Sequence, residues 1–361
     1  MKANLSRFLG ALAISWGLST AAWGQQPLPA PAPLPAPTPA VDGTRNNDSG
    51  TTAPMPVVPG GTIDALLPRG GLGGTWVVGG GIYVLGPISS NARAFTNEPI
   101  IGRASETNFT VNLNVAPLAF VGYSWDNGWG VRFRWYQFSA DASASATFAG
   151  QVEDATGRQA QLLGSGTVSA SGHLHVSAYD LEATYNTTMG QWLLVGSAGA
   201  RYGQINQGYG FEAAAVATGR SFASSDNHDF NGFGPTFALE GHRRLGDSTF
   251  GLYASARASI LFGSGQYSDS SMLTISPGNG RATGLGTSSS SSQTSVIPVG
   301  ELEFGGEWSR AWGRLRLFAQ VGVVGQIWWG TGSASDSASS QSGAPSNLGF
   351  IGGVARAGVS F

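Results

Sequence analysis

The sequence contains no cysteine and few charged side chains. Charged residues make up 11% of its 361 residues, whereas a typical soluble domain carries about 25%. The absence of cysteine excludes a disulfide framework and a thiolate metal site. The formal net charge is −2, so the strongly basic balance of nucleic-acid-binding domains is missing. We therefore expect neither an ordinary soluble domain nor a nucleic-acid partner.

A long hydrophobic run is also missing. Lys2 and Arg7 precede a mostly apolar run from Phe8 to Leu18, and small residues follow at 22 and 24. This pattern predicts a signal peptide over residues 1–24, and therefore export. A helical anchor is the alternative, but the run is shorter than the roughly 20 residues that such a helix needs. No later segment has the roughly 18 consecutive apolar residues that predict a spanning helix.

The stretch from 25 to 68 has few side chains that could form a buried core. "QQPLPAPAPLPAPTPA" favours polyproline II, and turn-forming residues follow it. We interpret residues 25–68 as a disordered Pro-rich linker between the signal peptide and a domain over residues 69–361. A role for this linker as a peptide ligand or as a cell-wall contact stays open.

What the sequence does have is glycine, 55 residues of it, and two-residue alternation of apolar and polar side chains. This alternation predicts ten strands, near 73–86, 107–125, 130–148, 162–186, 191–208, 229–244, 249–264, 295–309, 313–330 and 347–361. Tight connections alternate with long Ser/Gly-rich ones, which places all short turns at one end of a sheet. The sequence therefore predicts an all-β fold, a transmembrane antiparallel up-and-down β-barrel of ten strands with its long loops outside the cell.

One face of these strands is apolar, and the other carries isolated charges. From Trp192 to Tyr202 is about 25 Å along the membrane normal, the height of the apolar band of such barrels. The aromatic side chains expected to form girdles on the lipid side are Trp125, Trp129, Trp135, Trp192, Tyr202, Trp308, Trp312 and Trp329. The charged side chains expected to line the lumen are Arg132, Arg134, Asp180, Glu182, Arg201, Glu240, Arg257, Glu301, Glu303, Glu307, Arg316 and Arg356. A hairpin centred on Ala311 and Trp312 would place Glu307 opposite Arg316.

Two groups of residues are candidates for catalysis or metal binding. Asp226, His228 and Asp229 lie just before a predicted strand and resemble half of a rim protease site, but no second acidic pair accompanies them. His173 and His175 share a strand face, although two histidines without a third ligand do not make a metal site. We expect no enzyme activity, no metal and no cofactor.

Two hairpins resemble a known family. "AYDLEATY" and "LLVGSAGARYGQI" form the first, and "DFNGFGPTFALEGHRRLGDSTFGLYASARASILFG" forms the second. They are similar to the pore-forming outer-membrane proteins of the Legionella major outer membrane protein type. The resemblance implies an outer-membrane β-barrel with porin-like activity, in which Glu182, Arg201, Glu240 and Arg257 match recurring strand positions. It implies no active site. The Pro-rich leader is a departure from the family.

Three hypotheses about function follow. The first is a porin-like barrel that passes small solutes or ions through a narrow charged lumen. The second is a closed structural or adhesin-like barrel that acts through its Ser/Gly-rich loops, and the third is a rim hydrolase. In each case we expect an outer-membrane location with both termini in the periplasm. The expected partners are outer-membrane lipid and the barrel assembly machinery, which would read Phe361 as its signal. The oligomeric state stays open.

Overall fold

The structure is a computed structural model that describes residues 74–89, 92–100, 102–110, 112–160, 162, 164–276, 281–334 and 346–361. The predicted signal peptide and the Pro-rich linker lie outside these residues. No helix of the described residues is long and apolar enough to span a bilayer.

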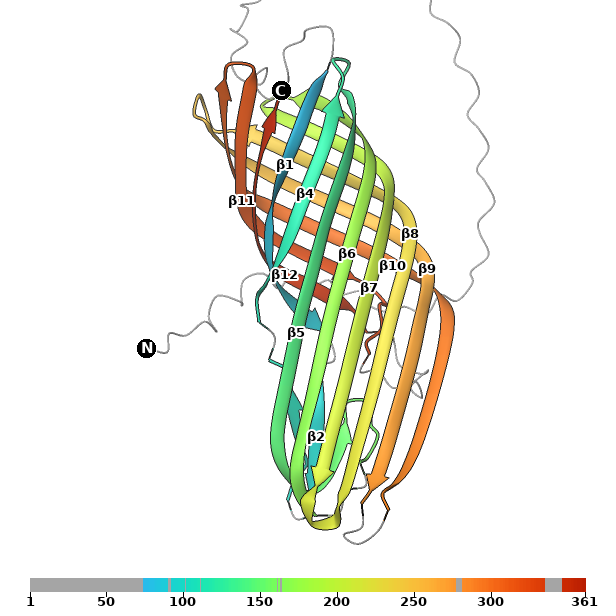
Figure 1. The fold of residues 1–361 in the computed structure, drawn as a ribbon. Coiled ribbons are helices and arrows are strands. Elements are labelled where there is room, and N and C mark those ends of the chain that lie inside the picture. Colours follow the sequence, from blue (N-terminus) through green and yellow to red (C-terminus); the bar gives the residue numbers. More distant parts are fainter. Residues whose placement is uncertain are drawn as a thin grey trace, which may run out of the picture. The chain divides into compact units, whose positions relative to one another are not determined.

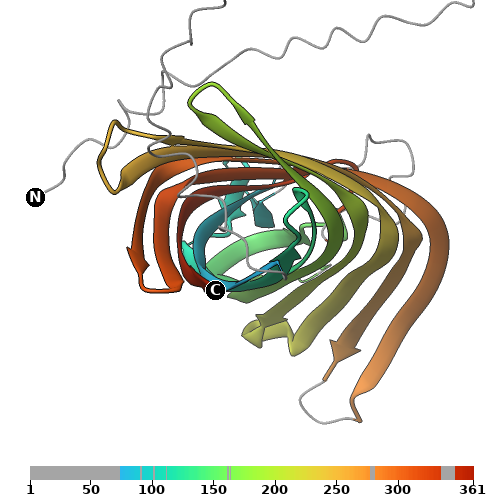
Figure 2. The same cartoon turned by 90° about the horizontal axis from the view of Figure 1, so that it is seen from above.

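Ten antiparallel strands close into a ring (Figures 1 and 2). They are β1 (Thr75–Ser89), β4 (Asn114–Ser124), β5 (Trp129–Asp154), β6 (Ser165–Met189), β7 (Trp192–Ala215), β8 (Arg220–Arg244), β9 (Phe250–Ile275), β10 (Thr283–Trp312), β11 (Leu315–Trp328) and β12 (Leu348–Ser360). Neighbours in this order are paired, and β12 closes the ring by pairing with β1 from Val77↔Ser360 to Ser89↔Leu348. The predicted fold class and its ten-strand ring are therefore confirmed.

The four tight turns lie at one end of the ring, where the C-terminus also lies (Figure 1). Each turn contains a glycine with positive φ, a conformation that costs glycine little: Gly128, Gly190, Gly246 and Gly313. At the same end, the Phe361 amide donates to the Trp76 carbonyl at 3.0 Å, and the Trp76 amide donates back at 2.9 Å.

At the other end, β5 and the strands from β7 to β10 extend 6 to 12 residues beyond their predicted bounds, whereas β6 begins at Ser165, close to its predicted start at 162. The segments 265–275 and 283–294, which the sequence predicts as parts of a long external loop, pair in register as parts of β9 and β10. Only η3 (Val216–Thr218) and Gly219 link β7 to β8. The loop prediction was wrong here because serine and glycine have low strand propensity, whereas unbroken backbone pairing to both neighbours outweighs that preference. A second long loop is predicted between the last two strands, from 331 to 346. Its residues 335–345 lie outside the residues that the structure describes.

A cap covers the inner face of this extension. It consists of β2 (Arg93–Pro99), β3 (Ser105–Asn108) and the turn 155–160. β2 pairs with the end of β5 and β3 pairs with β2. Apolar side chains of the cap, among them Phe95 and Ala160, pack in one buried cluster with Phe148 of β5 and Phe211 of β7. The far end of the ring is therefore filled.

The outer face changes character abruptly along β5 to β10. One row of paired residues is apolar and mostly aromatic: Trp135, Tyr179, Tyr202, Phe233, Phe262 and Val296. The next outward row, two residues farther from the short turns, is polar throughout: Gln137, Ser177, Gln204, Asn231, Ser264 and Thr294. We call these the aromatic row and the polar row. Since lipid-facing surfaces are apolar and edged by aromatic side chains, the lipid-facing surface of these strands ends between the two rows.

Candidate functional site

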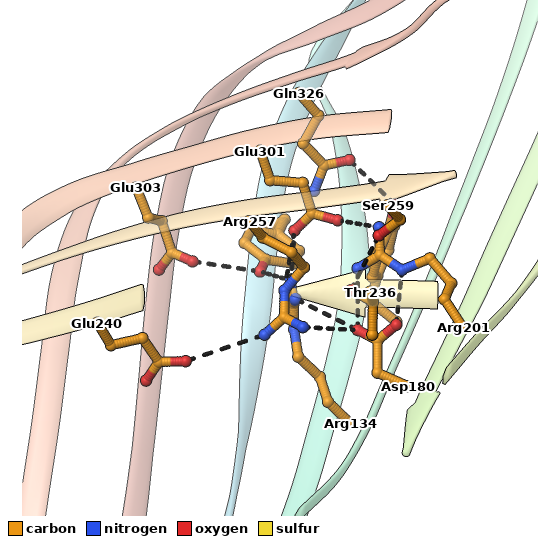
Figure 3. A network of polar contacts seen from close by, with 12 residues as sticks. Arg134, Asp180, Arg201, Thr236, Glu240, Arg257, Ser259, Glu301, Glu303 and Gln326 are labelled. Atoms are coloured by element: carbon orange, nitrogen blue, oxygen red, sulfur yellow. Dashed lines mark hydrogen bonds and ion pairs between the residues drawn. The ribbon is translucent and has the colours of Figure 1, made fainter. Parts of the chain in front are cut away.

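Ten charged side chains meet inside the ring, and we call them the charged layer; Figure 3 shows part of it, around Arg201 and Arg257. They are five arginines and five carboxylates: Arg132, Arg134, Arg201, Arg257, Arg356, Asp180, Glu182, Glu240, Glu301 and Glu303. Side-chain alternation along each strand turns these residues inward, and contacts between strands far apart in the sheet bring them together. Ten of the twelve charged residues predicted to line the lumen are therefore joined in ion pairs.

Arg201 on β7 is the most buried member, with a side chain that is 0% exposed. Its Nε lies 2.6 Å from Asp180 Oδ1, and its Nη2 lies 2.9 Å from Oδ2 of the same carboxylate. Its Nη1 lies 2.6 Å from Glu301 Oε1 on β10. One guanidinium therefore joins carboxylates from β6 and β10, with paired contacts of the kind that make arginine–carboxylate pairs strong.

Arg257 on β9 has several carboxylates within reach. It forms a close ion pair with Glu182, while its nitrogens lie 3.7 Å from Asp180, 3.9 Å from Glu240 and 4.0 Å from Glu301. These alternative partners come from three other strands. The ion pairs of the layer can therefore exchange through side-chain motion alone.

Two tyrosine hydroxyls complete the layer, and the sequence pattern did not predict them. Arg134 Nη2 donates to the Tyr83 hydroxyl at 2.7 Å. The hydroxyls of Tyr83 and Tyr253 lie 3.4 and 3.3 Å from Glu303. Each of these tyrosines occupies an inward position of its strand, but an alternation pattern that highlights charges does not single out a tyrosine.

The predicted pair between Glu307 and Arg316 is wrong. In the β10–β11 hairpin, Glu307 lies opposite Gln320, and Arg316 lies opposite Ala311. The turn falls at 313–314, beyond the predicted centre, because Gly313 supplies the positive φ. Glu307 instead accepts a hydrogen bond from Gln320 and lies 2.8 Å from His242 Nδ1.

An apolar layer fills the lumen next to the charged layer. On each strand that carries both, the charges lie nearer the short turns: Arg134 precedes Tyr136 and Phe138 on β5, and Arg201 precedes Ile205 on β7. All ten strands of the ring contribute to this buried cluster, which contains Trp328 at 0% exposure. The described lumen is thus filled by two successive cross-sections, one ionic and one apolar.

A cavity of about 230 Å³ lies beside the charged layer. Its wall includes Ser124, Asn186 and His242 near the short turns, and it reaches Arg134 and Glu301. Polar and charged groups therefore reach along this wall from the short-turn end to the charged layer, among apolar side chains such as Phe120 and Phe318.

A second ionic cluster anchors the cap at the far end. Asp154 Oδ1 accepts hydrogen bonds from the Thr156 and Arg158 amides at 3.0 and 2.9 Å, which closes the turn. Arg158 bridges Asp154 and Asp226 and lies 3.8 Å from Asp269. Burial raises the pKa of the Asp226 carboxyl to about 6, although the charge of Arg158 opposes this shift.

The structure separates the residues considered for catalysis or metal binding. Asp226 and His228 point into the ring within β8, where the His228 side chain stacks on Tyr267 with ring centres 4.0 Å apart. Asp229 lies on the outer face and accepts a hydrogen bond from Asn206 at 2.8 Å. His173 and His175 lie on β6, and His175 bonds to Ser139 and Ser177. Within the described residues, no group of three or more ligating side chains suits a metal ion.

Low-identity likeness to solved outer-membrane proteins accompanies this geometry. The outer membrane protease OmpT of Escherichia coli shares 9% identity at a TM-score of 0.37, with 80% of this chain and 96% of that chain covered. The outer membrane protein OprG of Pseudomonas aeruginosa shares 12% identity at a TM-score of 0.26, with 81% and 97% covered. The toluene transporter TodX of Pseudomonas putida shares 8% identity at a TM-score of 0.27, with 81% and 90% covered. These low scores carry no argument about activity.

Sequence comparison identifies the family. Curated proteins give no match. Residues 72–355 match the family described as "Legionella pneumophila major outer membrane protein precursor", which covers almost the whole of the ring described above. The chain therefore belongs to the Legionella major outer membrane protein family and is an outer-membrane β-barrel.

Proposed function

We propose that the barrel is a porin-like passage for small ions or solutes that is gated and is closed in the conformation described. The observation that carries this proposal is the charged layer directly followed by the apolar layer. Rings of charged side chains and hydrophobic constrictions are the two devices by which pores select ions and close. This lumen has both in series.

The charged layer favours a passage over a purely structural filling. Removing ten charges from water costs free energy, and apolar side chains of similar volume often fill a core equally well. The apolar layer of the same lumen is such a filling. The alternative partners of Arg257, at 3.7 to 4.0 Å, would let the ion pairs rearrange around a passing ion.

Single-channel recording in a planar bilayer tests the gate. Trp328 and Trp329 are adjacent, but Trp328 is fully buried in the apolar layer and Trp329 is 41% exposed on the outer face. We expect rare, small openings of the wild type, and an open probability at least tenfold higher for Trp328→Ala. Trp329→Ala is the matched control and should behave as the wild type. If the wild type and Trp328→Ala both fold and neither shows discrete channel openings, the proposal of a passage is refuted.

A permanently closed barrel is the second candidate. The apolar layer favours it, because all ten strands supply side chains to one buried cross-section. In this alternative the ring is a scaffold that holds the extended strands β5 to β10 outside the bilayer. Absence of conductance in every variant, together with normal membrane insertion, is the result that would support it.

A hydrolytic role at the rim has little support. Asp226 is paired with Arg158 beneath the cap, and only 2% of the His228 surface is exposed. A general acid or base has to reach the proton that it transfers, and both groups are covered. We therefore infer a non-enzymatic protein whose short turns and C-terminus face the periplasm, as in bacterial barrels generally.

A further inference from the structure

The outer face of the extended sheet is hollowed beyond the polar row. A depression of about 950 Å³ crosses all six strands from β5 to β10. A single row of paired residues runs across it, and we call this the serine row: Ser143, Ser171, Gly210, Ser225, Ser270 and Ser288. The size falls within the 300–1,000 Å³ that is usual for ligand sites.

The hydroxyls of the serine row are available to a ligand. All five serines are exposed, and within the part of the chain that the structure describes none of them bonds to another side chain. Closer to the membrane the same face is different, because Gln204 donates to Asn231 at 3.0 Å and His175 bonds to Ser139 and Ser177. These polar groups near the lipid-facing surface are thus satisfied internally, whereas the five hydroxyls of the serine row are left for water or a ligand, although other hydroxyls of the hollow, those of Ser271 and Thr287, bond to each other.

The chemistry of the wall favours a neutral, hydroxyl-rich ligand. Glu212 is the one charged side chain among the residues that line the hollow. An anionic headgroup would meet no basic partner there, and arginine or lysine is the usual means of holding phosphate. Gly210 leaves the space beside Ser171 open at the bottom of the hollow, since a Cβ at this position would lie 2.9 Å from Ser171 Oγ. A flat array of hydroxyl donors and acceptors matches the hydroxyls of sugar rings.

The position of the hollow relative to the membrane indicates where such a ligand would come from. It lies on the same outer face of the same strands as the lipid-facing surface, and beyond the polar row on the side away from the short turns. With the short turns in the periplasm, this face borders the headgroup layer of the outer leaflet, which in outer membranes is built of glycolipid. A second copy of the chain fits less well, because the buried aromatic anchors of protein interfaces are absent from the residues that line the hollow, except for the inward-facing Phe211.

We propose that the serine row binds the uncharged saccharide portion of an outer-leaflet glycolipid. The proposal rests on the orientation given under "Proposed function" but not on a conducting lumen, so a failure of the conductance experiment leaves it intact. Hydrogen bonds from several serines would hold a short oligosaccharide across β6, β8 and β9. Binding at the serine row would hold the outer face of the barrel to the glycolipids of the outer leaflet that surround it.

Isothermal titration of the detergent-solubilised barrel with lipid-free core oligosaccharide of lipopolysaccharide tests the proposal. Replacing Ser171, Ser225 and Ser270 together by alanine should weaken binding at least tenfold, because three neutral hydrogen bonds are lost. Threonine at the same three positions keeps the hydroxyls and should stay within threefold of the wild type. Gly210→Val keeps every hydroxyl but fills the floor, and should also weaken binding at least tenfold.

A control triple variant keeps the same residue types and the same outer face. Ser264, Ser268 and Ser292 lie on β9 and β10 outside the hollow, and their replacement by alanine should leave binding unchanged. Equal binding of the oligosaccharide to the wild type and to the Ser171/Ser225/Ser270 alanine variant would overturn the proposal. So would binding of lipid A vesicles alone, or self-association that the alanine variant abolishes without any saccharide binding.

Discussion

Replacing Arg201 by methionine tests whether the charged layer is one coupled unit. Methionine keeps much of the length of the side chain but removes the guanidinium that joins Asp180 and Glu301. Each of these two buried carboxylates then loses its nearest positively charged partner. The same replacement in an Asp180→Leu background removes both partners of the two-point contact between Arg201 and Asp180 and completes a double-mutant cycle.

The expected magnitude follows from burial and from the remaining partners. Breaking a buried ion pair by removal of one partner costs about 3–5 kcal/mol of unfolding free energy. Arg134 and Arg257 remain 3.5 and 3.7 Å from Asp180, so we expect about 3 kcal/mol for Arg201→Met. The double variant leaves less uncompensated charge. Its cost should fall short of the sum of the single costs by about 2 kcal/mol.

Urea unfolding of the barrel in detergent micelles, followed by tryptophan fluorescence, measures these free energies. Arg310→Met is the control, because Arg310 is exposed near the β10–β11 turn, and it should change the free energy by less than about 0.5 kcal/mol. A loss below about 1 kcal/mol for Arg201→Met, or strict additivity in the cycle, would refute the coupled layer.

Three further predictions concern orientation, pH and assembly. The chain has no cysteine, so single cysteines report topology: Ser288→Cys should react with an impermeant maleimide on intact cells, and Asp247→Cys in the β8–β9 turn only after the outer membrane is opened. Because burial raises the pKa of Asp226 to about 6, its contribution to cap stability is present in full below its ordinary pKa and is lost as the pH rises through 6. The protection factors of the amides in residues 155–160, which correct the exchange rates for their intrinsic pH dependence, should therefore be higher at pH 5 than at pH 7.5. Asp226→Asn should remove this difference and stabilise the cap by about 1 kcal/mol at pH 7.5; an unchanged pH profile in the variant would show that another group titrates. Deletion of Phe361 should lower the yield of membrane-inserted protein. Phe361→Ala keeps the backbone pairing with Trp76 and separates the ring from the hydrogen bonds, and full insertion of both variants would rule out Phe361 as the assembly signal.

Side-chain alternation was enough to predict the ring but not its interior. The two-residue period assigns Arg134, Arg201 and Glu301 to the inner face without any three-dimensional information. It does not reveal which carboxylate each arginine meets, because those partners come from strands that the tilt of the barrel brings to one height. Trp328 and Trp329 show the same limit. β11 ends at Trp328 and Trp329 follows it directly, and only the alternation of side chains decides that one fills the lumen while the other faces outward.

The far extent of β5 and of the strands from β7 to β10 could not be predicted from local preference. The serines from 288 to 292 have the composition of a flexible loop, yet they pair residue for residue with 266–270. Pairing is a property of two segments together, and a propensity scale evaluates one segment at a time. The misplaced Glu307–Arg316 pair has a similar origin, since a turn that falls a few residues later changes every partner in the hairpin.

The pairing of Phe361 with Trp76 has a consequence for biogenesis. The two strands that close the ring are separated by nearly the whole length of the barrel sequence, so the contact that removes the last open edges joins the first strand to emerge during export and the last. Until that contact forms, both edges expose unpaired backbone groups, which favour aggregation. A barrel of this wiring cannot complete its fold progressively as it emerges, and has to be kept soluble until the final strand arrives.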